Sequence, residues 1–233
     1  MIPWSLLDTA QVPGEGGELR LLRRGSEFSI RLGHYELMNS RRGGSEEALA
    51  TLACERIRSR QRPRILIGGL GMGFTLRAAL AALGAGARII VAELVPAVVR
   101  WARGPMREVF GESLTDPRVD TRETDVSHLI RSSPSAYDAI LLDVDNGPEA
   151  LTRKANDALY DLEGLSAARA ALRADGVLGV WSSDADSNFT RRLRKADFVV
   201  DEVRVHAAGS RGGARHVVWI ATRADRGRQA RNV

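Results

Sequence analysis

The sequence predicts an α/β fold in which helices cover both faces of a doubly wound, mostly parallel sheet. Apolar runs of strand length alternate with helix-compatible segments through most of the 233 residues. Uninterrupted runs such as "AILLD" are typical of parallel strands buried on both faces. A glycine-rich turn, "GGLGMG", follows the first of these runs. Together these observations indicate a Rossmann-like domain, and the chain is long enough for one such domain and a small appendage.

The N-terminal part reads differently from the rest. Residues 1–17 are rich in Pro and Gly and carry no motif, so we expect them to wrap loosely over the body. Short apolar runs from Glu18 to Asn39 are separated by glycines, which predicts a small antiparallel β appendage. Ser45, followed by Glu46 and Glu47, is typical of a helix N-cap with acids in the first turn.

From this helix onward the alternation is regular, and right-handed crossovers would place its strands in one sheet. Two later runs, "VVDEVRVHA" and "RHVVWIATR", surround a Gly-rich loop and predict a closing pair with an antiparallel last strand. We expect core strands at Arg64–Gly68, Arg88–Ala92, Arg118–Arg122, Tyr137–Leu142 and Val177–Trp181. The expected parts are an N-terminal extension with the β appendage (1–44), a Rossmann-like domain (45–222) and a basic mobile tail (223–233).

Composition excludes several classes of protein. The net charge is +5 and the pI is about 10.1, but acidic residues alternate with the arginines, which favours a mixed solvated surface over a nucleic-acid footprint. No run is long enough to span a bilayer, and no basic segment followed by a long apolar one opens the sequence. We therefore expect a cytoplasmic protein with no membrane partner.

Metal and disulfide chemistry are not indicated. The only cysteine, Cys54, has no partner for an internal disulfide and is expected to be buried filler. The histidines are scattered along the sequence, so no metal site is expected. They are His34, His128, His206 and His216.

The glycine turn lies where open parallel sheets bind ligands, after the first strand of the domain. Gly69, Gly71 and Gly73 alternate, so the backbone can bend sharply and approach a ligand without intervening Cβ atoms. Glu93 ends the next strand, where a carboxylate can accept hydrogen bonds from two ribose hydroxyls. The alternative is that the glycines only allow tight packing. The pattern as a whole favours a nucleoside ligand.

The spacing favours a particular kind of nucleoside. Dinucleotide domains use G-x-G-x-x-G, whereas this turn reads G-x-G-x-G, which fits a sulfonium nucleoside without pyrophosphate better. Asp125, after the third strand, could take a hydrogen bond from an adenine amino group, or it could be a helix N-cap. Asp143 ends the fourth strand in "LLDVDNGP" and is the candidate general base, unless it belongs to an ordinary solvated turn.

At these residues the sequence resembles the spermidine synthase family, the aminopropyltransferases built on the class I methyltransferase fold. The likeness is in "ILIGGLGMGFTLRAAL", "VAELVPAVVRWAR", "DPRVDTRETDVSHLI", "YDAILLDVDNGP" and "ALRADGVLGVWS". The resemblance implies that Glu93 holds the ribose and that Thr124 and Asp125 face the adenine. It implies that Asp143 deprotonates the attacking amine, and that the protein forms a homodimer.

The departures from the family bear on the substrate. Aminopropyl-transferring members carry an aspartate in the glycine turn that pairs with the amine of the decarboxylated cofactor, and Gly71 stands at that position. Bare amides there would suit the carboxylate of ordinary S-adenosylmethionine, which favours methyl transfer. The family's second substrate-loop acid is absent, with Asn146 near its place and Asp145 one step away. The segment "YELMNSRRGGSEEAL" does not reproduce the family's polyamine-binding residues either.

The leading hypothesis is a transferase that binds S-adenosylmethionine or its decarboxylated form and modifies a small acceptor, expected to be an amine. Asp145, Asn146 and Tyr160 are candidates to line the acceptor pocket, although Tyr160 could equally be helix packing. For Trp181 core packing is favoured over a place in the pocket wall. The alternatives are aminopropyl transfer to a diamine and a binding protein that has lost turnover. A nicotinamide dehydrogenase is disfavoured by the glycine spacing.

Overall fold

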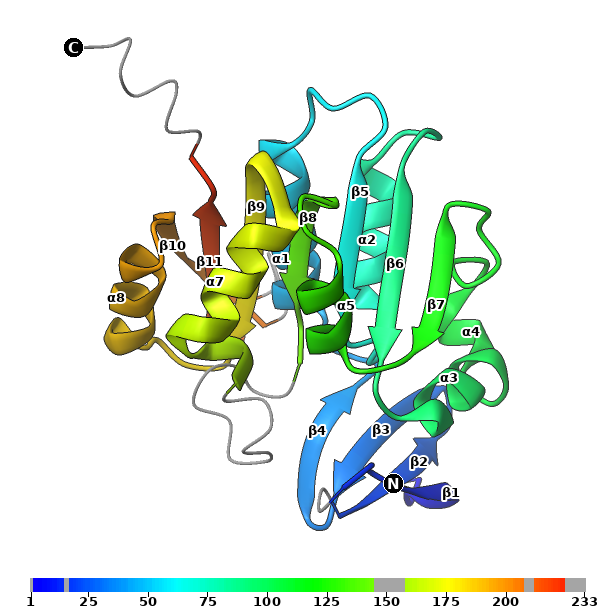
Figure 1. The fold of residues 1–233 in the computed structure, drawn as a ribbon. Coiled ribbons are helices and arrows are strands. Elements are labelled where there is room, and N and C mark those ends of the chain that lie inside the picture. The colour runs from blue at the N-terminus through cyan, green and yellow to red at the C-terminus, as the bar shows by residue number, and fades with distance from the viewer. Residues whose placement is uncertain (1, 15–16, 145–157, 208–211, 225–233) are drawn as a thin grey trace, which may run out of the picture.

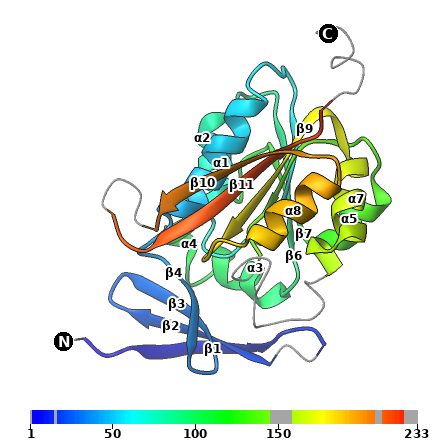
Figure 2. The same cartoon turned by 90° about the vertical axis from the view of Figure 1, so that its left-hand side faces the viewer.

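An N-terminal antiparallel sheet lies beneath a larger α/β layer structure in this computed structural model (Figures 1 and 2). The structure describes residues 2–14, 17–144, 158–207 and 212–224. Asp145, Asn146 and the basic tail from residue 225 lie outside these ranges.

The N-terminal sheet has four strands in the order β1-β2-β3-β4, and neighbouring strands are antiparallel. The predicted β appendage is present, but residues expected to wrap loosely also form a strand. β1 is an edge strand whose side chains are almost all exposed. Its sequence therefore has no alternation of apolar and polar residues from which a strand could be predicted. The strands are β1 (Ser5–Gln11), β2 (Glu18–Arg24), β3 (Glu27–Leu32) and β4 (Tyr35–Asn39).

Helix α1 (Gly44–Arg56) starts two residues earlier than predicted. Gly43 is its N-cap and no side chain caps the helix, so the prediction that Ser45 is the cap is wrong. Ser45 lies inside the first turn, where it is fully buried, and its hydroxyl faces Glu46 and His216. The Ser45 hydroxyl, which the sequence pattern assigned to a helix cap, therefore contacts His216 of β11 instead.

The large sheet has seven strands in the order β10-β11-β9-β8-β5-β6-β7. The five strands β6 to β9 and β5 run parallel, and β11 is antiparallel to both of its neighbours, as the sequence predicts. The order reverses at β5, which lies between β6 and β8, so the turn after β5 is at the topological switch point. The strands are β5 (Arg64–Gly68), β6 (Arg88–Glu93), β7 (Val119–Glu123), β8 (Tyr137–Leu142), β9 (Leu172–Ser182), β10 (Val199–His206) and β11 (Arg215–Thr222).

Helices cover both faces of this sheet (Figure 2). α1 and α2 pack on one face and α5, α7 and α8 on the other, and each face has its own hydrophobic cluster. Cys54 is in the first cluster, where burial raises the pKa of its thiol to about 12. The helices are α2 (Phe74–Ala82), α3 (Pro96–Arg103), α4 (Arg107–Phe110), α5 (Val126–Ser132), α7 (Leu162–Ala171) and α8 (Ser187–Lys195).

The carboxyl ends of the parallel strands point toward the N-terminal sheet (Figure 1). Leu21 and Ile30 of that sheet are fully buried in the same cluster as Val95 and Val98, which follow β6. The sheet is thus anchored across the end of the domain where a doubly wound fold binds ligands. No helix among the described residues is long and apolar enough to cross a membrane.

Candidate active site

The three glycines of the turn all have positive φ, at +90° for Gly69, +51° for Gly71 and +73° for Gly73. A Cβ on Gly69 would lie 2.4 Å from the carbonyl oxygen of Asp143, and one on Gly73 would lie 2.4 Å from the ring of Phe110. These two glycines are required by packing. A Cβ on Gly71 would meet only the Met38 sulfur, at 3.4 Å, so Gly71 is the position where the turn opens to a cavity.

Glu93, at the end of β6, is buried with 7% of its surface exposed. Its carboxylate accepts hydrogen bonds from the amides of Leu70 (2.9 Å) and Val95 (2.8 Å). Burial nevertheless raises its pKa, because desolvation outweighs the backbone hydrogen bonds. The amides of Gly71 and Leu94 also act on this carboxylate and lower its pKa, so the backbone around the switch point converges on Glu93.

A cavity of about 120 Å³ lies at the carboxyl ends of β5 to β8. Its walls include side chains from the N-terminal sheet, Leu37 and Met38 among them, so that sheet closes the site from below. The cavity brings together most of the residues predicted to hold the cofactor. Those lining it are Gly69, Gly71, Glu93, Thr124, Asp125 and Asp143.

Asp125 combines the two roles considered for it. It is the N-cap of α5, where its carboxylate accepts a hydrogen bond from the Ser127 amide at 2.8 Å. It also lines the cavity beside Thr124, whose amide donates to the backbone oxygen of Glu93 at 2.9 Å. The cap fixes the carboxylate at the cavity wall, beside the end of the Glu93 strand.

A second cavity, of about 60 Å³, adjoins the first. The two share Leu37, Met38, Gly71 and Asp143, so Asp143 stands at their boundary. The walls of the second cavity are otherwise mainly apolar, and Trp181 is one of them, although the sequence favours core packing for it. The Trp181 ring meets that of His216 edge to face at 5.0 Å, so it packs and lines the cavity at once.

Asp143 is held by a neutral partner. Its Oδ2 accepts a hydrogen bond from the Thr75 hydroxyl at 2.6 Å. Burial raises its pKa from 3.8 to about 6, although the hydrogen bond from Thr75 acts in the opposite direction. A carboxylate with this pKa is suited to accept a proton near neutral pH.

Glu46 is the functional candidate that the sequence missed, and it lines the second cavity together with Asp143. The Ser45 hydroxyl donates to its Oε2 at 2.5 Å and lies 2.9 Å from Nδ1 of His216. Burial, and secondarily the charge of Asp143, raises the pKa of Glu46 from 4.5 to about 7. Among the described residues, neither carboxylate lies within ion-pair distance of an Arg, Lys or His side chain.

The acceptor candidates are less well placed. Tyr160 is buried, with 2% of its surface exposed, and its ring packs edge to face on Phe189 at 5.7 Å. Its neighbour Leu159 lines the first cavity instead. Within the described ranges, no three His, Cys, Asp or Glu side chains are grouped so as to hold a metal ion.

Comparison with known proteins points to one family. No protein-family model matches the chain. It is 30% identical over 152 residues to polyamine aminopropyltransferases of Mycobacterium tuberculosis and Mycobacterium bovis, an alignment that covers 61% of this chain and 28% of theirs. It superposes on spermidine synthase from Thermotoga maritima with a TM-score of 0.75, at 18% identity over 94% of this chain and 73% of that one. The chain is thus similar in fold to spermidine synthase and, over part of its length, similar in sequence to polyamine aminopropyltransferases.

A second solved structure, a spermidine synthase in complex with the transition-state analogue AdoDATO, has a TM-score of 0.73 at 18% identity over 94% of this chain and 72% of that one. The spermidine synthase-like fold, with its mostly parallel sheet and N-terminal antiparallel sheet, is therefore as the sequence predicts. The chain spans about 28% of the length of the curated relatives that it matches. Fold alone does not establish activity, because one fold can carry many different active sites.

Proposed function

We propose that this chain is a transferase that binds an adenosyl sulfonium donor and moves the donor's aminopropyl group to an amine. One observation carries the proposal: Glu46 and Asp143 line a single small cavity beside Gly71 without a cationic partner among the described residues. Two such carboxylates attract a positively charged arm and repel a negatively charged one.

This placement weighs against the methyl transfer favoured by the sequence. That argument rested on Gly71, since bare amides suit the carboxylate of S-adenosylmethionine. The cavity next to Gly71 contains two acids, and a third carboxylate there would be repelled. The decarboxylated donor keeps the ammonium group of the arm and lacks its carboxylate. The curated relatives bear the name polyamine aminopropyltransferase, which supports the same donor, and none of the comparisons supports methyl transfer.

The first cavity fits the nucleoside end of that donor. Glu93 would accept hydrogen bonds from the ribose hydroxyls, and Thr124 and Asp125 would face the adenine. Gly71 lets the backbone approach the donor where a side chain would fill the space. The sulfonium itself supplies an electrophilic carbon, so the protein has to align the amine with it and remove a proton.

Asp143 is the proposed general base, because it stands where the two cavities meet. The acceptor nitrogen gives a proton to the Asp143 carboxylate and uses its lone pair to form the new C–N bond in line with the C–S bond. The electron pair of the C–S bond leaves with sulfur, which becomes a neutral thioether. Thr75 holds the carboxylate in place, and Trp181 and Met38 help to exclude water.

The acceptor end remains a proposal from the resemblance. On this ground, Asp145, Asn146 and Tyr160 are proposed to contact the acceptor amine. A homodimer is proposed on the same grounds, and sedimentation of the purified protein tests it.

An activity assay separates the candidate functions. The protein is incubated with the decarboxylated donor and a series of diamines, and release of methylthioadenosine is measured by chromatography. A second series replaces the donor by S-adenosylmethionine and follows S-adenosylhomocysteine. We expect methylthioadenosine with a diamine present. S-adenosylhomocysteine alone would establish methyl transfer, and donor binding without either product would indicate a binding protein.

A further inference from the structure

We propose that Glu46 is the residue that selects the donor, by pairing with the ammonium end of its arm in place of the aspartate that is absent at Gly71. The inference rests on the proposed function and goes further, because it assigns separate roles to the two acids of the second cavity. Glu46 binds the donor's cation, while Asp143 serves the acceptor nitrogen.

The layout of the two cavities leads to this assignment. Gly71 and Met38 border both cavities, whereas Glu46 lines only the second. A donor whose nucleoside fills the first cavity can therefore extend its arm past Gly71 toward Glu46. A side chain on Gly71 would also point at this boundary, because its Cβ would lie 3.4 Å from the Met38 sulfur. An acid at position 71 and an acid at position 46 thus reach the same space from different elements.

Glu46 is available for a cation. Among the described residues, its carboxylate accepts one side-chain hydrogen bond, from the Ser45 hydroxyl to Oε2 at 2.5 Å, which leaves the other carboxylate oxygen for a ligand. The Asp143 carboxylate is occupied on one side by Thr75. Two neighbouring carboxylates without a cation repel each other, and a bound ammonium group removes that repulsion.

Ser45 and His216 fix the direction in which Glu46 points. A hydroxyl has one proton, so when Ser45 donates to Glu46 it can only accept from His216, whose Nδ1 lies 2.9 Å away. When Nδ1 of His216 carries a proton, it donates to the Ser45 hydroxyl, and that hydroxyl donates to the ionised Glu46 carboxylate. Ser45 is fully buried, so water does not compete for its two hydrogen bonds. Ser45 and His216 are positioning residues and need not touch the donor.

The test is calorimetric titration of Glu46→Gln with the decarboxylated donor and with methylthioadenosine, which has the nucleoside but no cationic arm. Loss of one charge-assisted hydrogen bond should weaken binding of the donor about 10- to 100-fold. Binding of methylthioadenosine should stay within about twofold, which also shows that the variant folds. The matched control is Glu47→Gln, because Glu47 is the adjacent acid of the same helix and lines a different surface groove with Arg77.

A second substitution at Gly71 tests whether a negative charge in the second cavity is what binds the donor. Glu46→Gln combined with Gly71→Asp should regain most of the lost donor affinity. The same variant combined with Gly71→Asn should not, since asparagine has the same shape and also tolerates positive φ. Glu46→Asp, which keeps the charge on a shorter side chain, should retain part of the preference.

The outcomes distinguish this inference from the proposed function. A wild-type protein that binds the decarboxylated donor no better than methylthioadenosine contradicts both. A wild-type protein that binds and uses the donor, with Glu46→Gln unaffected, contradicts the Glu46 assignment alone. Equal rescue by Gly71→Asn and Gly71→Asp also contradicts it, because shape rather than charge would then be responsible.

Discussion

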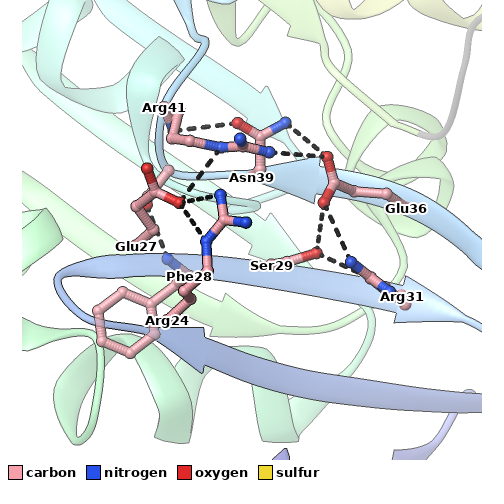
Figure 3. Close-up of polar contacts among 9 residues, drawn as sticks. Arg24, Glu27, Phe28, Ser29, Arg31, Glu36, Asn39 and Arg41 are labelled. Carbon is pink, nitrogen blue, oxygen red and sulfur yellow. Dashed lines mark hydrogen bonds and ion pairs between the residues drawn. The ribbon is translucent and has the colours of Figure 1, made fainter. Parts of the chain in front are cut away.

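Two groups of acids, one on the N-terminal sheet and one in the second cavity, differ in whether arginine side chains neutralise them. On the sheet, Glu27 accepts from Arg24 at 2.6 Å, and Glu36 accepts from the Ser29 hydroxyl at 2.7 Å and lies near Arg31 and Arg41 (Figure 3). Each of these carboxylates is matched by arginine. They belong to an ordinary neutralised surface network.

The acids of the cavity have hydroxyl partners instead. Glu46 is held by Ser45 and Asp143 by Thr75, and among the described residues no arginine reaches either one. The chain has 34 Lys and Arg residues against 29 Asp and Glu, so cations to neutralise the pair are not scarce. Two partly buried acids without a cationic partner lower the stability of the protein. Such an arrangement is typical of a binding site in which the ligand supplies the positive charge.

The largest effect is expected from Asp143→Asn. Asparagine retains an oxygen that can accept from Thr75, but it cannot take a proton from the acceptor amine. Turnover should fall about 100- to 10,000-fold, as is typical for loss of a general base. Binding of methylthioadenosine should be unchanged. Turnover near the wild-type rate, measured by methylthioadenosine release, would contradict the assignment of Asp143 as base.

Glu93→Gln tests a buried acid that differs from both groups, because backbone amides satisfy it. The new NH₂ group would face the amide of either Leu70 or Val95, and two donors cannot pair. We expect a loss of about 1–3 kcal/mol in the free energy of unfolding and weaker binding of methylthioadenosine. Chemical denaturation and calorimetry measure the two effects. Unchanged nucleoside binding would exclude Glu93 as the ribose ligand.

The pH dependence of stability should reveal the unneutralised pair. The pKa of Glu46 is raised from 4.5 to about 7 and that of Asp143 from 3.8 to about 6, so between pH 4 and 7 the native state holds protons that the unfolded chain has released. Stability therefore falls as the pH rises through this range. Glu46→Gln should match the wild type near pH 4 and exceed it at pH 8 by about 2 kcal/mol. If Glu46→Gln and the wild type were equally stable at both pH values, the ionised Glu46 carboxylate would not destabilise the native state.

The smallest effect is expected on the N-terminal sheet. Glu27→Gln removes a partly exposed ion pair with Arg24 and should change the free energy of unfolding by less than about 1 kcal/mol, in the destabilising direction. Thermal denaturation at low and high salt measures it, since screening should reduce the difference. A stabilising effect like that of Glu46→Gln would remove the contrast between the two groups of acids.

Much of the fold could be predicted because its signals are local. Four of the five parallel strands contain a continuous apolar run, whereas β7 (VDTRE) is largely polar. The glycine turn follows the first of these runs, which is sufficient to place Gly71, Glu93 and Asp143 together at the carboxyl ends of the strands. β1 could not be predicted, because an exposed edge strand leaves no apolar alternation. The division into residues 1–44, 45–222 and 223–233 stays a prediction.

Glu46 could not be predicted for a different reason. The pattern Ser45-Glu46-Glu47 indicates the start of a helix, but which of two adjacent acids faces inward depends on how that helix packs on the sheet. In the structure Glu46 lines the cavity and Glu47 is exposed. The absence of an acid at Gly71 was readable from the sequence, whereas its replacement from another element required the fold.

The central claim is that the second cavity selects a cationic arm. Calorimetric titration of the wild-type protein at pH 8 with decarboxylated and ordinary S-adenosylmethionine tests it most directly, because the two ligands differ only in the carboxylate. The account predicts that the decarboxylated ligand binds at least about tenfold more tightly, given the size of charge-assisted interactions. Equal binding of the two ligands, or tighter binding of the carboxylated one, would contradict it.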